Sequence, residues 1–126
     1  MLNKDLMDIG AAQLVYRSLV ADGWRALPFE AFSKGVTVHW IRRGPDDEPT
    51  LALLKYEPGG KVPRHLHTGP ETVLVLDGVQ SDDNGDYPAG TFVLNDTGSK
   101  HSVWSESGCV VLIQWSRPVV LLGENG

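Results

Sequence analysis

The sequence has very few cysteines and no long apolar run. Cys109 is the only cysteine among 126 residues, so an internal disulfide cannot form and a thiolate metal site is excluded. No stretch approaches the roughly 20 apolar residues that cross a bilayer, and the N-terminus lacks the apolar core of a signal peptide. We therefore expect a cytoplasmic protein that makes no membrane contact and needs no disulfide framework.

Positive charge is also scarce. Eleven lysines and arginines stand against sixteen aspartates and glutamates, which gives a formal net charge of −5. A protein that binds the phosphate backbone of nucleic acid presents a surplus of basic residues. We therefore expect no nucleic-acid partner, and the negative charge identifies no substrate.

One segment near the N-terminus has helical character. Between Asp8 and Asp22 the apolar residues approximate a stripe of 3.6-residue period, Asp8 can cap the start, and Gly23 can end the helix. This pattern predicts a short amphipathic helix. We expect residues 1–23 to form a helical extension and residues 24–126 to form one domain.

Turn-forming residues are abundant in the rest of the chain. Fourteen glycines and eight prolines are spread along the sequence and separate short apolar runs rich in β-branched residues. Because no helix-length pattern lies between the runs, they predict an antiparallel sandwich or barrel. The predicted strands are Val36–Ile41, Thr50–Tyr56, Glu71–Leu76, Thr91–Leu94, His101–Trp104, Cys109–Trp115 and Pro118–Leu122.

Three of the four histidines can be interpreted together as metal ligands. His65 and His67 are separated by one residue, so on an extended chain both side chains point to one face. The tripeptide at residues 68–70, Thr-Gly-Pro, suits a bend that returns Glu71 beside them. His101 opens a later predicted strand and could add a fourth ligand. Imidazole nitrogens with one carboxylate oxygen suit Zn(II), Fe(II), Mn(II), Ni(II) or Cu(II).

Other reactive side chains have simpler interpretations. His39 is alone on a predicted strand, where a histidine usually packs or hydrogen-bonds. Cys109 begins an apolar run and is expected to be a buried small hydrophobic residue. The acidic segment Asp82–Asp86 is expected to be a solvated hairpin loop. Tyr87 is open to two interpretations, a residue at a pocket mouth or one that packs in the turn.

The glycines around the histidines follow a known pattern. Gly59, His65, His67, Glu71 and Gly78 are separated by five, one, three and six residues. This spacing resembles the first conserved motif of the cupin superfamily at every defining position. The resemblance implies an all-β fold, a small antiparallel jelly-roll-like β-barrel.

The second cupin motif is matched in part. Gly85, Pro88 and Gly90 supply its glycine and proline positions, and His101 occupies its histidine position. Ser105 stands where the motif usually ends in asparagine, and the gap before the histidine is longer than usual. These departures are found in one particular branch of the superfamily.

The stretch Gly78–Cys109 closely resembles the ChrR-like cupin family, and the resemblance extends over residues 24–116. This family includes the C-terminal domain of ChrR-type anti-sigma factors and free-standing cupins, some of them dioxygenases. The resemblance implies one divalent metal ion, Zn or Fe first with Ni or Mn as alternatives, and no other cofactor. The ligands that it implies are His65, His67, Glu71 and His101.

Two functions are expected from this resemblance. The first is a metal-dependent oxidoreductase of the dioxygenase type that acts on a small dicarbonyl or hydroxyaryl ketone. The second is a non-catalytic zinc cupin that senses a ligand or an oxidant. A purely structural metal is a weaker third interpretation, because a barrel of this size has enough core without one. No catalytic residue beyond the metal ligands is identified.

The expected partners are a small-molecule ligand and a second copy of the chain. The apolar tail Val119–Leu122 is one candidate for the homodimer contact, or it closes the barrel. ChrR itself binds its sigma factor through an N-terminal zinc domain with histidine and cysteine ligands. Because Met1–Gly23 contains neither residue type, we expect this chain not to sequester a sigma factor alone.

Overall fold

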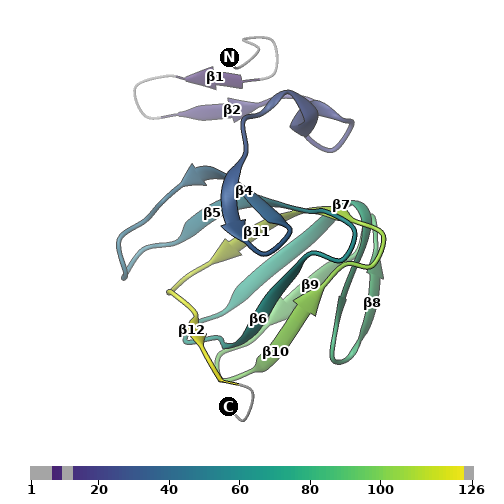
Figure 1. Ribbon diagram of the computed structural model, residues 1–126. Helices are drawn as coiled ribbons and strands as arrows, with labels where there is room; N and C mark the ends of the chain where they lie inside the picture. The colour runs from purple at the N-terminus through teal and green to yellow at the C-terminus, as the bar shows by residue number, and fades with distance from the viewer. Residues whose placement is uncertain (1–6, 10–12, 124–126) are drawn as a thin grey trace.

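The computed structural model describes residues 7–9 and 13–123, which form antiparallel β-structure. β1 (Met7–Ile9) and β2 (Leu14–Tyr16) pair in a small sheet, and ten further strands form a sheet that curls into a half-barrel (Figure 1). The predicted all-β class is therefore confirmed. The ten strands are β3 (Glu30–Ser33), β4 (Val36–Arg42), β5 (Thr50–Tyr56), β6 (Lys61–Leu66), β7 (Glu71–Asp82), β8 (Gly85–Pro88), β9 (Phe92–Asn95), β10 (Lys100–Trp104), β11 (Cys109–Trp115) and β12 (Val120–Leu121).

The helix predicted between Asp8 and Asp22 is wrong. The described residues of this segment form β1 and β2, followed by a four-residue 3₁₀ turn at Gly23–Ala26, and residues 10–12 lie outside the described part. Ser18 and Asp22 have φ of 56° and 70°, the left-handed region, which a right-handed helix cannot accommodate. Tertiary packing therefore overrides a weak local periodicity. Among the described residues no helix is long and apolar enough to cross a membrane.

The segment after β2 covers the outer face of the large sheet. In β5, Ala52 and Leu54 belong to the core inside the barrel, whereas Leu53 between them packs outward against Trp24 and Leu27. Both faces of β5 are thus buried, which explains why its sequence is an almost continuous apolar run. Burial of a side chain such as Leu53 stabilises the fold by about 1.5–3 kcal/mol.

Strand β7 is the central element of the large sheet. It runs from Glu71 to Asp82 and pairs with β8, β9, β10 and β11. The strand predicted from the sequence ends at Leu76, but the chain bends at Gly78, with φ of 72°, and the strand continues to Asp82. The register against β11 shifts between Val110 and Val111, so a bulge accompanies the bend.

Gly78 has no room for a side chain. A Cβ atom at this position would overlap the carbonyl oxygen of Gly108 and lie 2.9 Å from the Cα atom of Cys109. Gly78→Ala is therefore expected to lower the free energy of unfolding by about 2–4 kcal/mol, because steric overlap adds to the strain of positive φ. Urea denaturation followed by tryptophan fluorescence measures this loss.

Gly90 provides the matched control for the Gly78 variant. It also has positive φ, 92°, but an added Cβ would meet no atom within 4 Å. Gly90→Ala should therefore show backbone strain alone, about 1 kcal/mol. Equal losses of unfolding free energy in Gly78→Ala and Gly90→Ala would show that the close approach of β7 to β11 does not restrict Gly78.

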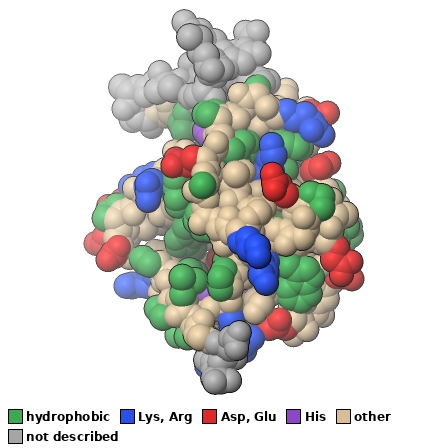
Figure 2. Space-filling model, in the orientation of Figure 1, with side chains coloured by type: hydrophobic (Ala, Val, Ile, Leu, Met, Phe, Trp, Pro, Cys, Tyr) green, Lys and Arg blue, Asp and Glu red, His purple; other side chains and the backbone are tan. Residues whose placement is uncertain are grey.

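The C-terminal strand β12 closes one edge of the large sheet. Val120 pairs with Leu66 and Leu121 pairs with His65 of β6. The apolar tail is therefore the edge strand of the large sheet, and the side chains of Val120 and Leu121 remain exposed. On the face shown in Figure 2, basic and acidic side chains are interspersed and hydrophobic side chains are visible between them.

Candidate metal centre

The β6, β7 and β10 region brings the four predicted ligands together. His65 in β6 and His101 in β10 are directly paired across the antiparallel ladder. His67 follows the end of β6, and Glu71 opens β7 after the intervening residues 68–70. The predicted same-face pair of histidines and the predicted return of the chain are both present. All four side chains gather in one cluster.

The cluster is compact and buried. The ligand atoms lie within 4.8 Å of one another, and each of the four residues is between 1% and 5% exposed. The three imidazole rings meet edge to face, with centroids 4.7–4.9 Å apart. Oε1 of Glu71 lies 3.3 Å from Nε2 of His67. Three imidazole nitrogens and a carboxylate oxygen at these separations form a donor set for one divalent transition metal.

The Nδ1 atom of each histidine faces a hydrogen-bond acceptor outside the cluster. Because carbonyl and carboxylate oxygens accept and do not donate, each Nδ1 carries a hydrogen and donates it. Each neutral imidazole therefore directs the lone pair of Nε2 toward the other ligands. The acceptors are the carbonyl oxygens of Pro63 for His65 (2.8 Å) and Ser99 for His67 (3.0 Å), and the carboxylate of Asp82 for His101 (3.1 Å).

The Nε2 lone pairs of the three histidines face the centre of the cluster with no hydrogen between them. Nε2 of His65 and Nε2 of His101 are 3.1 Å apart, and Nε2 of His67 is buried with no hydrogen-bond partner among the described residues. Facing lone pairs repel, and an unpaired buried acceptor costs about 1–3 kcal/mol. A cation at the centre, either a proton or a metal ion, removes both costs. The residues present therefore fit a divalent metal.

Burial opposes protonation of both His65 and His67, but the net pKa shifts of the two residues have opposite directions. Desolvation lowers the pKa of His65, and the neighbouring His101 lowers it further, which favours the neutral form that binds a metal. Desolvation also opposes protonation of His67. The carboxylate of Glu71, whose Oε1 lies 3.3 Å from Nε2 of His67, stabilises the protonated ring more than burial disfavours it, and the pKa of His67 is raised. A metal ion at the centre competes with that proton for Glu71.

Asp82 orients His101, although the sequence pattern does not reveal this role. The sequence predicts a solvated loop at Asp82–Asp86, but the structure buries Asp82 at the end of β7. Its second carboxylate oxygen accepts hydrogen bonds from the hydroxyl of Tyr87 (2.7 Å) and the backbone N–H of Asn84 (2.8 Å). Although burial raises the pKa of Asp82, the hydrogen bonds from these groups and from His101 lower it overall. Tyr87 therefore packs in the turn as a partner of Asp82.

Asn95 orients Glu71, and the sequence pattern does not reveal it either. It lies opposite Glu71 in the pairing of β9 with β7, and its Nδ2 atom donates to Oε1 of Glu71 at 3.1 Å. Such outer contacts fix the orientation of metal ligands and tune their affinity. Each carboxylate or imidazole of the cluster thus has a partner that holds it in place.

His39 and Cys109 lie outside the cluster, as predicted. His39 is on β4, where its Nδ1 donates to the carbonyl oxygen of Pro28 (2.9 Å) and its Nε2 accepts from the hydroxyl of Tyr16 (2.8 Å). It joins the N-terminal segment to the sheet. Cys109 is buried, and desolvation raises its pKa to about 11. A thiol of that pKa is protonated at neutral pH and is a poor nucleophile.

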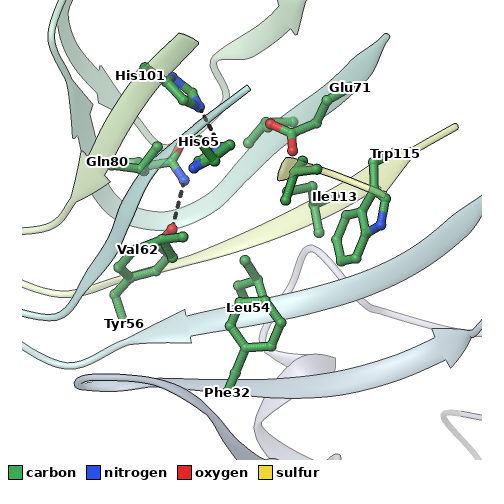
Figure 3. Close-up of a pocket in the computed structure, with 13 residues that line it drawn as sticks. Phe32, Leu54, Tyr56, Val62, His65, Glu71, Gln80, His101, Ile113 and Trp115 are labelled. Carbon is green, nitrogen blue, oxygen red and sulfur yellow. Dashed lines mark hydrogen bonds between the residues drawn. The ribbon is translucent and has the colours of Figure 1, made fainter. Parts of the chain in front are cut away.

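An apolar pocket of about 50 Å³ adjoins the cluster (Figure 3). His65, Glu71 and His101 form part of its wall, and most of the remaining wall is aliphatic or aromatic. Among the residues that line the pocket, Phe32 is the one exposed residue, and Trp115 is half-buried. The wall therefore includes an exposed aromatic residue as well as the buried histidines.

Comparisons with known proteins agree with this geometry. The family model of the ChrR cupin-like domain matches residues 20–117, whereas no curated protein matches the chain. The anti-sigma factor ChrR of Rhodobacter sphaeroides, solved in complex with SigE, has a TM-score of 0.67 and 26% identity, covering 78% of this chain and 54% of that chain. An acetylacetone dioxygenase from Acinetobacter johnsonii has a TM-score of 0.72 and 16% identity, and the match covers 78% of this chain and 74% of that chain.

A third solved structure gives the same fold. A protein of unknown function with a cupin-like fold from Ralstonia eutropha JMP134 has a TM-score of 0.68 and 20% identity, covering 73% of this chain. This chain spans 61% of that protein. The family match covers most of the chain and includes all four residues of the buried cluster. The chain belongs to the family of ChrR cupin-like domains.

Proposed function

We propose that this protein binds one divalent metal ion through the His65, His67, Glu71 and His101 cluster and acts as a dioxygenase-type oxidoreductase on a small organic substrate. The observation that carries the proposal is the position of the cluster, because three of its four residues, His65, Glu71 and His101, form part of the wall of an apolar pocket. A structural metal needs no such pocket, whereas a catalytic metal keeps a coordination position open toward one.

The charge of the cluster selects the kind of ligand. Three neutral imidazoles and one carboxylate leave a net charge of about +1 on a site that holds a divalent ion, which favours an anionic bidentate group such as an enolate. A bound iron ion would supply the redox chemistry and Lewis acidity for a reaction with O₂. The apolar wall excludes water from the reacting groups, and Asp82 and Asn95 hold His101 and Glu71 in orientation.

The fold shared with the acetylacetone dioxygenase from Acinetobacter johnsonii supports a small dicarbonyl as the substrate class. A ChrR-type zinc cupin that binds a ligand or an oxidant without catalysis is the second candidate. The family match and the 26% identity to ChrR favour it. Both candidates use the same four ligands, so the metal and the reaction distinguish them.

Metal analysis and oxygen uptake separate the two candidates. Protein reconstituted with Fe(II) and supplied with acetylacetone is expected to consume O₂ at least about tenfold faster than metal-free protein, because the metal brings both reactants together. Zinc-loaded protein is the control and should consume none. Zinc alone in protein purified without added metal, with no O₂ uptake after Fe(II) is restored, would favour the sensor and contradict the dioxygenase proposal.

A further inference from the structure

Tyr56 and Gln80 are the two uncharged amide or hydroxyl side chains in the wall of the pocket. Tyr56 comes from β5 and Gln80 from β7, and both residues are buried, at 4% and 6% exposed. Figure 3 shows the Gln80 amide directed at the Tyr56 hydroxyl, with His65 and His101 in the same wall. The Nε2 atom of Gln80 donates to the hydroxyl oxygen of Tyr56 at 3.4 Å.

This hydrogen bond leaves both groups incompletely paired. Its length exceeds the usual 2.7–3.2 Å of an N–H donor bonded to oxygen. Within the described ranges, the Tyr56 hydroxyl donates to no protein atom and the Oε1 atom of Gln80 accepts from none. Burial raises the pKa of Tyr56, so the hydroxyl keeps its hydrogen at neutral pH. Buried polar groups normally find partners, and here the available space is the pocket.

The pocket also limits the size of what it holds. A cavity of 150 Å³ accommodates benzene, whereas the volume here is about 50 Å³. A ligand that lies wholly inside this volume is therefore smaller than benzene, and a short aliphatic ketone such as acetone is of that size.

We infer that Tyr56 and Gln80 form a second attachment point that binds a carbonyl oxygen of a short aliphatic ligand lying beside the metal centre. The assignment of that ligand as the substrate rests on the proposed function. The attachment point itself rests on the unpaired hydroxyl hydrogen of Tyr56 and the apolar surroundings. A ligand lacking an oxygen acceptor leaves this hydrogen unpaired and binds more weakly.

Acetone is a direct probe of this attachment point, because it is short, aliphatic and accepts hydrogen bonds without donating. In crystals of the zinc-loaded protein soaked in acetone, we expect the carbonyl oxygen about 3 Å from the Tyr56 hydroxyl. In Tyr56→Phe crystals treated identically, acetone should leave that position or turn its oxygen away. Acetone absent from the wild-type pocket, or bound with its oxygen elsewhere, overturns the inference, as does an ordered water on Tyr56 that acetone fails to displace.

A binding measurement in solution tests the same point without catalysis. The zinc-loaded wild type, Tyr56→Phe and Tyr16→Phe are titrated with acetylacetone and, separately, with azide, an anion that binds metals. Loss of one neutral hydrogen bond is expected to weaken acetylacetone binding by about 3- to 10-fold in Tyr56→Phe and to leave azide binding unchanged. Tyr16→Phe is the matched control, because its hydroxyl bonds to His39 outside the pocket.

The outcomes separate this inference from the proposed function. Equal acetylacetone affinities in the wild type and Tyr56→Phe overturn the attachment point even if the protein consumes O₂. Acetone bound on Tyr56 in crystals supports the attachment point even if no O₂ uptake is found, and the dioxygenase proposal alone then fails. A parallel loss of azide and acetylacetone affinity would show that Tyr56 acts through the metal centre and would also overturn the inference.

Discussion

His67→Ala protein is expected to retain less than about a tenth of the metal bound by the wild type after purification and dialysis. The substitution removes one of four proposed ligands and leaves a void beside the rings of His65 and His101, whose centroids both lie within 5 Å of the His67 ring centroid. Mass spectrometry of the metal content measures the loss, and O₂ uptake should fall with it. His67→Gln, which keeps more of the side-chain volume, should also lose most of the metal.

His39→Ala is the matched control for this experiment. His39 is also a buried histidine on the large sheet, but it bonds to Tyr16 and Pro28 on the outer side. Its loss should lower the melting temperature and leave the metal content at the wild-type level. Full metal content in both His67 variants would refute the ligand assignment. Metal loss in His39→Ala would show that general destabilisation, not ligand removal, causes the effect.

Asp82→Asn is expected to weaken Zn(II) affinity by about 10- to 100-fold while the four ligands remain in place. The carboxylate accepts the Nδ1 hydrogen of His101, which holds the ring with Nε2 toward the cluster. A neutral amide is a weaker acceptor and can also present its N–H₂ group to His101. Competition with a chromogenic chelator measures the affinity.

The neighbouring residue provides a control for the charge change. Asp83 pairs with Arg64 at 2.9 Å on the surface, so Asp83→Asn removes the same charge one position away without touching His101. Zinc affinity should then stay within about twofold of the wild type, because exposed ion pairs contribute little. If both variants bind zinc equally, the contact between Asp82 and His101 does not orient the ligand.

The ligand cluster was the most predictable part of the site. Spacing of two residues places His65 and His67 on one face of an extended chain whatever the tertiary fold, and the Thr-Gly-Pro bend returns Glu71 over a short distance. The strands Thr50–Tyr56 and Cys109–Trp115 were predicted with the observed bounds because both are long apolar runs closed by turn residues. Local chemistry decides these features, so the sequence alone reveals them.

Features that depend on distant contacts were not predictable. Strands β3 and β8 are four residues long with polar character, and they exist because β4 and β7 offer them partners. Asp82 looks like one of several turn carboxylates until β7 is extended through Gly78. Alternation then places Asp82 on the same face as Gln80. The N-terminal apolar residues fit a helical stripe as well as a sheet, and packing on the outer face decides between them.

Strand β7 carries one residue for nearly every part of the site. Glu71 lies at its start, Gln80 lies in the pocket wall, and Asp82 at its end holds His101. Because side chains alternate between faces, deleting one residue between Thr72 and Val79 would turn the later residues to the opposite face. The positions of the cluster and of the pocket wall therefore depend on the exact length of one twelve-residue strand. Insertions during divergence or design would be tolerated in the loop at residues 43–49 but not in this strand.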